Sequence, residues 1–286
     1  MDIPAMLHYL QGQPIVFMVV ATALGLMIGS FLNVVISRYP KQLEWRWRQE
    51  ALSFLNLEPD PTPEPPNVVT KASHCPQCGH AIRWWENIPV ISFLLLKGKC
   101  RGCKTPISWQ YPLVEILTGI LFGLAALQFG PTWFWVSSVI GISLLIAASG
   151  IDFKIMILPD PMMYSLLWLG LLTAVLGWGT LTPSQAIIGA MVGYLSLWSV
   201  FWLFKLITGK EGMGYGDFKL LAALGAWIGA PSLLPAIMVA AFTGAILGII
   251  QLKRQKESQP FPFGPFIAIG GLIEWLSQGA LRQWIF

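Results

Sequence analysis

The chain has 286 residues, of which 55% are hydrophobic and only 11% are charged, and its mean hydropathy is +0.63. A soluble globular domain carries about 25% charged residues, so this composition excludes an ordinary soluble domain and indicates an integral membrane protein. The net charge is only +4, and the basic residues are spread over several loops rather than gathered on one face, so we expect no nucleic-acid partner.

The first predicted membrane span covers residues 14–36, since about 20 apolar residues are needed to cross the hydrocarbon core. Ala21, Gly25 and Gly29 recur along it every four residues, a pattern that lets a neighbouring helix approach closely. No basic segment precedes this span, so we expect an uncleaved first helix rather than a removable secretory signal.

A large polar block follows, and then hydrophobic runs resume. Within the block, residues 58–66 are rich in proline and acidic side chains and predict an extended linker rather than a packed element. Gly-Pro and similar turn signals separate several of the later runs. These runs predict seven more spans, at about 113–129, 132–150, 161–178, 184–207, 217–230, 233–251 and 263–281.

The predicted fold class is therefore an all-α polytopic membrane protein with about eight transmembrane helices and a cytoplasmic zinc-knuckle loop domain. We expect three parts: a first transmembrane helix in 1–36, the loop domain in 37–111, and a seven-helix membrane domain in 112–286.

The distribution of basic residues predicts which loops lie on the cytoplasmic side of the membrane. If the loop domain is cytoplasmic, alternation of the spans places 151–160, 208–216 and 252–262 on the same side. With short flanks, these regions hold all of the 18 Lys and Arg residues except Arg282. Cytoplasmic loops carry the excess of basic residues, so we expect a multi-pass membrane protein with both termini on the far side, which is periplasmic if the membrane is the inner membrane of a diderm bacterium.

All four cysteines lie in the loop domain, as two Cys-x2-Cys pairs: Cys75 with Cys78, and Cys100 with Cys103. Four thiolates in this pattern form a tetrahedral structural zinc site. A reducing cytosol argues against two disulfides, and iron–sulfur ligation remains an alternative. Because a closed four-sulfur site has no open position, we expect zinc to stabilise the loop and not to catalyse.

Two aspartates lie at predicted cytoplasmic ends of spans. Asp217 follows Gly214 and Gly216 between two long apolar runs, and Asp152 ends the span 132–150. An ionised Asp near the bilayer centre costs about 2.5–3.5 kcal/mol, so a carboxylate at such a place calls for a reason. The two glycines carry no side chains and leave room for the backbone of an extended peptide.

Two carboxylates brought close in a partly dry site share a proton. One can then draw a proton from water while the other donates to a scissile carbonyl, which is aspartic-protease chemistry. Three other interpretations stay open: Asp217 caps its helix, Asp152 pairs with Lys154, or Asp160 replaces one member of the pair. Asp160 follows Leu-Pro and better fits a helix start.

Several motifs together resemble one family, and they run nearly from end to end. They are the segment Gly29 to Ile36, the four-cysteine loop, Asn87 to Ser92, Ile107 to Glu115, Asp152 with Leu158-Pro159-Asp160, Gly212 to Leu220, and Phe263 to Phe266. The chain is similar to the type IV prepilin peptidases, which are bifunctional leader peptidases and N-methyltransferases of pilus and type II secretion systems. These belong with the Gly-x-Gly-Asp intramembrane aspartyl proteases. The resemblance implies that Asp152 and Asp217 are the catalytic pair.

The resemblance also implies the substrates. Prepilins and pseudopilins carry a short basic leader that ends in glycine; cleavage follows that glycine at the cytoplasmic membrane face, and S-adenosylmethionine then methylates the new N-terminus. Membrane lipid is the other expected partner. For methyl transfer the candidates are Glu86, Asn87 and Glu115, although Glu86 also fits a solvated loop carboxylate and Glu115 a partner of a nearby Arg or Lys. No Rossmann fingerprint is present in the sequence.

Two other classes of function stay open. Paired intramembrane carboxylates also mark ion paths, so the chain fits an ion-coupled transporter with an Asp pair as its proton relay. It also fits a non-enzymatic assembly factor whose zinc knuckle docks a cytoplasmic partner. Cleavage of a prepilin without an ion gradient separates the enzyme from both.

Overall fold

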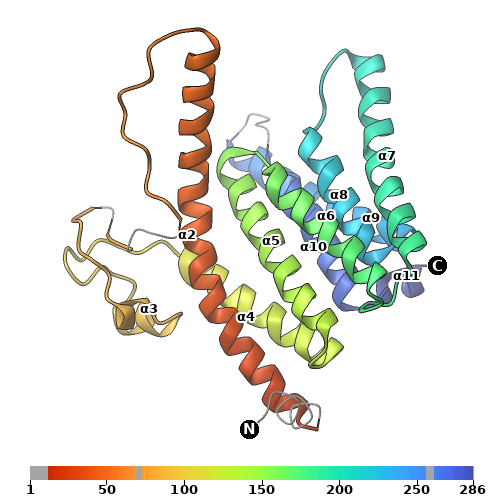
Figure 1. Ribbon diagram of the computed structural model, residues 1–286, viewed down its shortest axis with the longest axis horizontal. Helices are drawn as coiled ribbons and strands as arrows, with labels where there is room; N and C mark the ends of the chain where they lie inside the picture. Colours follow the sequence, from red (N-terminus) through yellow and green to blue (C-terminus); the bar gives the residue numbers. More distant parts are fainter. Residues whose placement is uncertain (1–11, 69–72, 76, 256–260, 286) are drawn as a thin grey trace. The chain divides into compact units, whose positions relative to one another are not determined.

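The computed structural model describes residues 12–68, 73–75, 77–255 and 261–285 (Figure 1). The fold is helical throughout, and the only β-pairing in these ranges is two isolated bridges, His74 with Ala81 and Lys99 with Pro106. The all-α prediction is therefore confirmed. The chain divides into two compact units, Val19–Gly123 and Met1–Met18 with Leu124–Phe286.

The unit Val19–Gly123 is built on two long helices. Its elements are α2 (Pro14–Phe54), the 3-10 helix η1 (Trp84–Asn87), α3 (Ile91–Leu95) and α4 (Gln110–Phe129). The predicted close-packing face of the first helix is present: a Cβ on Gly25 would lie 2.7 Å from the carbonyl oxygen of Thr118, and one on Gly29 would lie 2.7 Å from the Cα of Glu115. Small residues on α2 thus let the α4 backbone approach closely.

Helix α2 does not end at residue 36, where the predicted span ends. It continues through Pro40 to Phe54 as one helix of 41 residues, because the sequence from 41 to 54 contains no glycine or proline to stop it. The apolar part of the helix is thus followed by a charged extension of the same helix.

The proline-rich segment is extended as predicted, but it packs against this extension of α2. Arg48 pairs with Asp60 at 3.0 Å, and Gln49 donates to the carbonyl oxygen of Asp60 at 3.1 Å. Further along, Trp45 donates to the carbonyl of Thr62. Prolines keep the segment extended, and side chains of α2 satisfy its carbonyl groups, so the expectation of an unpacked linker is wrong.

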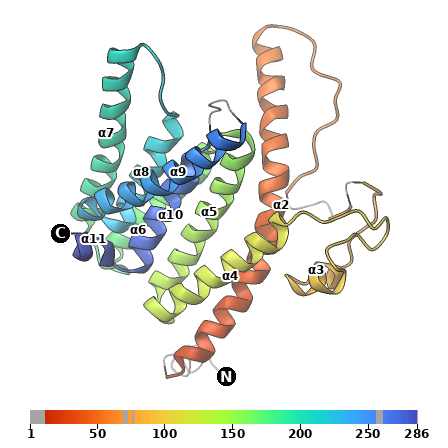
Figure 2. The same ribbon diagram turned by 180° about the vertical axis from the view of Figure 1, so that it is seen from behind.

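The second unit is a helical bundle arranged around α8 (Figures 1 and 2). Its elements are α5 (Trp133–Ile155), α6 (Asp160–Val175), α7 (Pro183–Thr208), α8 (Tyr215–Ile228), η2 (Ala230–Ser232), α9 (Leu233–Gln255), α10 (Gly264–Leu276) and α11 (Ala280–Ile285). Helices α6, α7, α9 and α10 all pack on α8, and every residue from Leu220 to Ile228 is buried. Asp217 and Phe218, in the first turn of α8, are buried as well.

Helix ends in this bundle follow local sequence signals. Thr182 accepts a hydrogen bond from the backbone of Gln185, whose side chain accepts one from the backbone of Thr182, so α7 begins with a capping box. Gly209 ends that helix with φ of 70°, a conformation that glycine adopts without strain. Gly229 ends α8 with φ of 74° in the same region of backbone space.

Helices occupy all eight predicted span regions, but five of them are long and apolar enough to cross a membrane. These five begin at Pro14, Gln110, Trp133, Pro183 and Ala230. The helices at 160–175, 215–228 and 264–276 have 16, 14 and 13 residues, shorter than a full crossing requires. The count of eight spans is therefore not confirmed. Residues 256–260 of the predicted loop 252–262, and residues 1–11 of the predicted periplasmic N-terminus, lie outside the described residues.

The crossing of α7 and α8 depends on glycine. A Cβ at Gly189 would lie 2.1 Å from the carbonyl oxygen of Gly225, so Gly189→Ala forces the two backbones apart. We expect this change to lower the free energy of unfolding by at least about 1–3 kcal/mol, the usual cost of overpacking, measured by unfolding in mixed micelles. Gly248→Ala is the control, because its Cβ would make only ordinary contact at 3.6 Å. Equal stability of the two variants contradicts this account of the crossing.

Candidate functional site

Asp152 lies in the last turn of α5 with its side chain in the interior. The residue is 4% exposed, and its buried Oδ2 atom has no hydrogen-bond partner among the described residues. The helix stops directly afterwards because Met156 adopts a left-handed conformation with φ of 53°. Gly264, the first residue of α10, packs against the carboxylate, since an added Cβ there would lie 2.7 Å from Oδ2.

Asp217 lies in the first turn of α8 and is 7% exposed. The backbone at Gly214, the N-cap of this helix, is extended and open, because the nearest atom to an added Cβ would be 4.0 Å away. Gly216 is different: a Cβ there would lie 2.9 Å from the Cβ of Leu158. Open backbone suited to a peptide is thus found at Gly214, whereas Gly216 lets α8 pack tightly.

Leu158 is the side chain that holds this arrangement together. It is 6% exposed and packs against Gly216 on α8 and against Gly264 on α10, where an added Cβ would meet its Cδ1 at 3.0 Å. Asp152 and Asp217 adjoin these contacts and are close enough for their charges to interact. The structure therefore brings together the two predicted carboxylates from different helices.

Asp160 is engaged elsewhere. It begins α6, as its place after Leu-Pro indicates, and its Oδ1 accepts a hydrogen bond from Lys219 Nζ at 2.6 Å. The same ammonium group lies 5.6 Å from the ring centroid of Tyr164. This ion pair joins the start of α6 to α8, so the Asp160 carboxylate is engaged with a cation on α8.

The four cysteines also come together. Their sulfur atoms all lie within 4.8 Å of one another and could hold a metal ion. Two similar turns present them, because the N–H of Gly79 donates to the carbonyl of Cys75 and that of Lys104 donates to the carbonyl of Cys100. Gly79 and Lys104 have positive φ angles of 70° and 63° at equivalent positions. The loop backbone thus forms two matched knuckles.

The surroundings of the sulfur atoms shift the pKa values of two of the thiols in opposite directions. The hydroxyl of Thr105 lies 3.1 Å from the sulfur of Cys103 and, with the Thr105 backbone, lowers the pKa of that thiol to about 6. Although a hydrogen bond from the backbone of His80 lowers the pKa of Cys78, the neighbouring thiols, Cys103 foremost, raise it to about 11. A thiol ligates a cation in its deprotonated form, and a cation among the four sulfur atoms would offset the repulsion between their charges.

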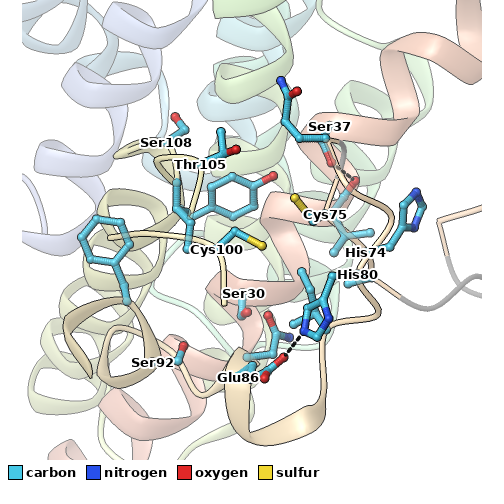
Figure 3. A pocket seen from close by; sticks show the side chains of 18 of the residues that line it. Ser30, Ser37, His74, Cys75, His80, Glu86, Ser92, Cys100, Thr105 and Ser108 are labelled. Atoms are coloured by element: carbon cyan, nitrogen blue, oxygen red, sulfur yellow. Dashed lines mark hydrogen bonds and ion pairs between the residues drawn. The ribbon is translucent and has the colours of Figure 1, made fainter. Parts of the chain in front are cut away.

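Glu86 ties the two knuckles together. Its side chain is 5% exposed, and one oxygen lies 3.1 Å from His80 Nε2, beside the first knuckle (Figure 3). The other oxygen lies 3.2 Å from the guanidinium of Arg101 in the second knuckle. The backbone N–H of Arg83 also donates to it, and these contacts lower the pKa of Glu86 below its usual range. The interpretation of Glu86 as a solvated loop carboxylate is therefore wrong.

A cavity of about 540 Å³ opens beside this ion-pair cluster (Figure 3). Residues of α2, of both knuckles and of the start of α4 line it, and all of them belong to the unit Val19–Gly123. All three predicted methyl-transfer candidates, Glu86, Asn87 and Glu115, are among the lining residues. Its size falls within the range of about 300–1,000 Å³ that is usual for small-molecule sites.

Glu115 is the buried acid of this cavity. It is 7% exposed, its Oε2 accepts a hydrogen bond from the backbone N–H of Val90 at 2.8 Å, and the hydroxyl of Ser30 donates to the same carboxylate. Val90 has φ of 60° and ψ of −47°, a conformation that β-branched residues rarely adopt. No described Lys or Arg pairs with Glu115, so the predicted ion-pair alternative is wrong.

Strained backbone of this kind persists only where the surrounding structure enforces it, and it clusters at functional sites. Sequence reasoning did not find Val90, because nothing in Asn-Ile-Pro-Val signals a positive φ at valine. It also passed over Leu158 and Gly264 as packing partners of the Asp pair. Their contacts become visible only once three helices meet.

Comparison with known proteins gives two family matches. Residues 23–129 match the Bacterial Peptidase A24 N-terminal domain, and residues 139–249 match the Type IV leader peptidase family. The first match contains the cavity and the cysteine cluster, and the second contains Asp152 and Asp217.

Curated relatives match over nearly the whole chain. A protein of Pseudomonas aeruginosa is 51% identical over 273 residues, covering 95% of this chain and 94% of its own length. A relative from Xanthomonas campestris is 49% identical and covers 88% of this chain and 88% of its own length. A relative from Aeromonas hydrophila is 46% identical and covers 98% of this chain and 97% of its own length. All three are named prepilin leader peptidase/N-methyltransferase. No solved structure matches the chain.

Proposed function

Because the chain belongs to the type IV leader peptidase family, we propose that it removes the leader of prepilins and pseudopilins and methylates the new N-terminus. Cleavage follows a glycine at the cytoplasmic face of the bacterial inner membrane. The protein is multi-pass, with the cysteine loop cytoplasmic and both termini periplasmic, as its basic loops indicate. Residues 37–111, together with the adjoining start of α4, carry methyl transfer, and the remainder of 112–286 carries the peptidase. Membrane lipid surrounds the helices, and nucleic acid is not a partner.

One observation supports the peptidase most strongly: Asp152 and Asp217, both buried, adjoin one packed cluster at the ends of α5, α8 and α10. In such a place the two carboxylates share one proton. The ionised member draws a proton from water, which attacks the scissile carbonyl, and the protonated member donates to the carbonyl oxygen. Gly214 offers open, extended backbone beside them for the peptide.

The test is cleavage of a synthetic prepilin by the purified protein in detergent, with no ion gradient. The proposal expects release of the leader after its glycine, unaffected by inhibitors of serine proteases and by chelators added during the assay. An ion-coupled transporter or an assembly factor would leave the peptide intact. Family membership already argues against both alternatives.

The metal we propose for the cysteines is zinc in a structural role. A tetrahedral site with Zn–S bonds of about 2.3 Å has sulfur atoms about 3.8 Å apart. The sulfur atoms of Cys75 and Cys103 are 3.8 Å apart, and all four lie within 4.8 Å, so the donor set fits this ion. Cys75, Cys78, Cys100 and Cys103 would all be ligands, which leaves no open coordination position for chemistry.

For methyl transfer we propose the cavity of about 540 Å³. S-adenosylmethionine, when bound there, supplies the methyl group. Glu115 faces this space with one oxygen held by Val90, so it can orient the new N-terminal amine and accept the proton that the amine loses. Asn87 lines the same space, whereas Glu86 acts by holding the knuckles together.

Glu115→Gln should separate the two activities. The amide oxygen can still accept from Val90, but the side chain no longer accepts a proton, so methylation should fall about 10²-fold or more while leader cleavage stays unchanged. Both rates are read from the mass of the product N-terminus. Glu64→Gln, an exposed change in the proline-rich segment, is the control. Full methylation by Glu115→Gln would show that Glu115 takes no part in methyl transfer.

A further inference from the structure

A second, smaller cavity lies at the opposite ends of the helices that carry the Asp pair. It has a volume of about 150 Å³ and is lined by residues that include Trp227, at the end of α8, and Glu274 and Trp275, at the end of α10. Asp217 opens α8 ten residues earlier, which is about 15 Å along the helix axis. The cavity is therefore separate from the peptidase site.

Glu274 is the residue in this cavity that calls for a ligand. It is 1% exposed, and both of its carboxylate oxygens are buried with no hydrogen-bond partner among the described residues. It also lies in the last turn of α10, where the helix dipole disfavours an anion. An ionised carboxylate in this position needs a donor or a cation, and no residue that the structure describes donates a hydrogen bond to it.

The cavity also presents donors. The buried Nε1 of Trp275 has no partner among the described residues, and the guanidinium of Arg282 lines the cavity without an ion pair to any of them. A bare metal ion would satisfy Glu274 but would be repelled by Arg282 and would leave the indole N–H unpaired. The groups present therefore suit a ligand that carries both a cationic donor and an anionic acceptor.

The walls and the size narrow the class of ligand. The rings of Trp227 and Trp275 are 4.1 Å apart, and that of Phe134 lies 6.2 Å from Trp227, so aromatic faces that attract cations border the cavity. The volume corresponds to about five water molecules at about 30 Å³ each. An ethylammonium arm with its ester oxygen has a comparable size. A quaternary ammonium has no N–H to donate to Glu274.

We propose that this cavity binds the headgroup of a zwitterionic phospholipid with a primary ammonium group. The ammonium group donates to Glu274 beside the tryptophan rings, and the phosphate lies toward Arg282 and accepts from the guanidinium. The loops after α6, α8 and α10 supply the lining of the cavity at the ends of apolar helices, which is the level where headgroups lie. The site does not depend on the proposed peptidase or methyltransferase activity.

The experiment is lipid titration of the full-length protein in detergent, followed by native mass spectrometry. Short-chain phosphatidylethanolamine is compared with phosphatidylcholine and phosphatidylglycerol of the same chain length, and with free ethanolamine and inorganic phosphate. We expect phosphatidylethanolamine to bind at least about tenfold more tightly than the other two lipids, and Glu274→Gln to abolish that preference. Arg282→Gln should weaken binding of phosphatidylethanolamine but not of free ethanolamine.

Glu211→Gln, an exposed change paired with Lys205, is the matched control and should bind as the unchanged chain does. Equal affinity for the three lipids, or an unaltered preference in Glu274→Gln, overturns the proposal and leaves a cavity filled by water. Phosphate binding as tightly as the lipid would indicate a site for a soluble anion instead. If Glu274→Gln does not fold, the exposed Arg282→Gln variant decides by the same comparison.

Discussion

Asp217→Asn and Asp152→Asn should each abolish leader cleavage while leaving the protein folded. Asparagine keeps the size of the buried side chain but cannot exchange a proton, so the loss should reach about 10²–10⁴-fold or the limit of detection. Cleavage of a synthetic prepilin, followed by mass spectrometry, measures the rate. Methylation of a peptide that already lacks its leader should continue, because Glu115 and its cavity lie in the other unit.

The control for the Asp pair is Glu211→Gln. It removes a carboxylate from the same unit, but one whose side chain is 62% exposed and paired with Lys205. We expect its cleavage rate to match that of the unchanged chain. Normal processing by either Asp variant would refute the shared-proton pair, and loss of folding would be seen as a lowered unfolding temperature.

Cys75→Ser should remove the bound metal and disorganise the loop. Cys75 is 7% exposed within the sulfur cluster, and structural zinc contributes about 10–16 kcal/mol to the folding of small zinc domains. Because both knuckles line the cavity that contains Glu115, methylation should fall to near background while leader cleavage persists. Metal content by mass spectrometry, proteolysis of the loop and the mass of the product N-terminus measure the three effects.

Lys104→Gly is the matched control for the metal site. Lys104 lies in the second knuckle at the position that Gly79 occupies in the first, with φ of 63°, and glycine adopts this conformation without strain. This variant should keep its metal and both activities. Equal loss of cleavage and methylation from a folded Cys75→Ser protein would contradict separate sites.

The site residues that could be predicted from the sequence are those that differ chemically from their neighbours or recur at a regular spacing. Asp152 and Asp217 interrupt apolar runs, and the cysteines keep a spacing that only a compact cluster explains. The structure places each set together. Glycines at the first helix were also found, because a four-residue spacing directly predicts a close helix contact, and Gly25 and Gly29 make one.

Other features depend on contacts between distant segments, and no local pattern reveals them. Glu86 is ordinary in the sequence, yet it binds both knuckles. Val90 combines a positive φ with a hydrogen bond to Glu115, which is 25 residues away in the sequence. The helix starting at Tyr215 is short because Gly214 and Gly229 bound it, so hydropathy alone overstates the number of complete crossings. The cavity around Glu274 is likewise lined by the segments that follow α6, α8 and α10, which are far apart in the sequence.

The most direct measurement combines the purified protein, a synthetic prepilin and S-adenosylmethionine with a labelled methyl group, and then determines the mass of the product N-terminus. The account predicts a peptide cut after the leader glycine and heavier by one labelled methyl group. It further predicts that Asp217→Asn yields the intact peptide and Glu115→Gln the cut but unmethylated one. An intact prepilin from the unchanged protein, or a cut product from Asp217→Asn, would contradict it.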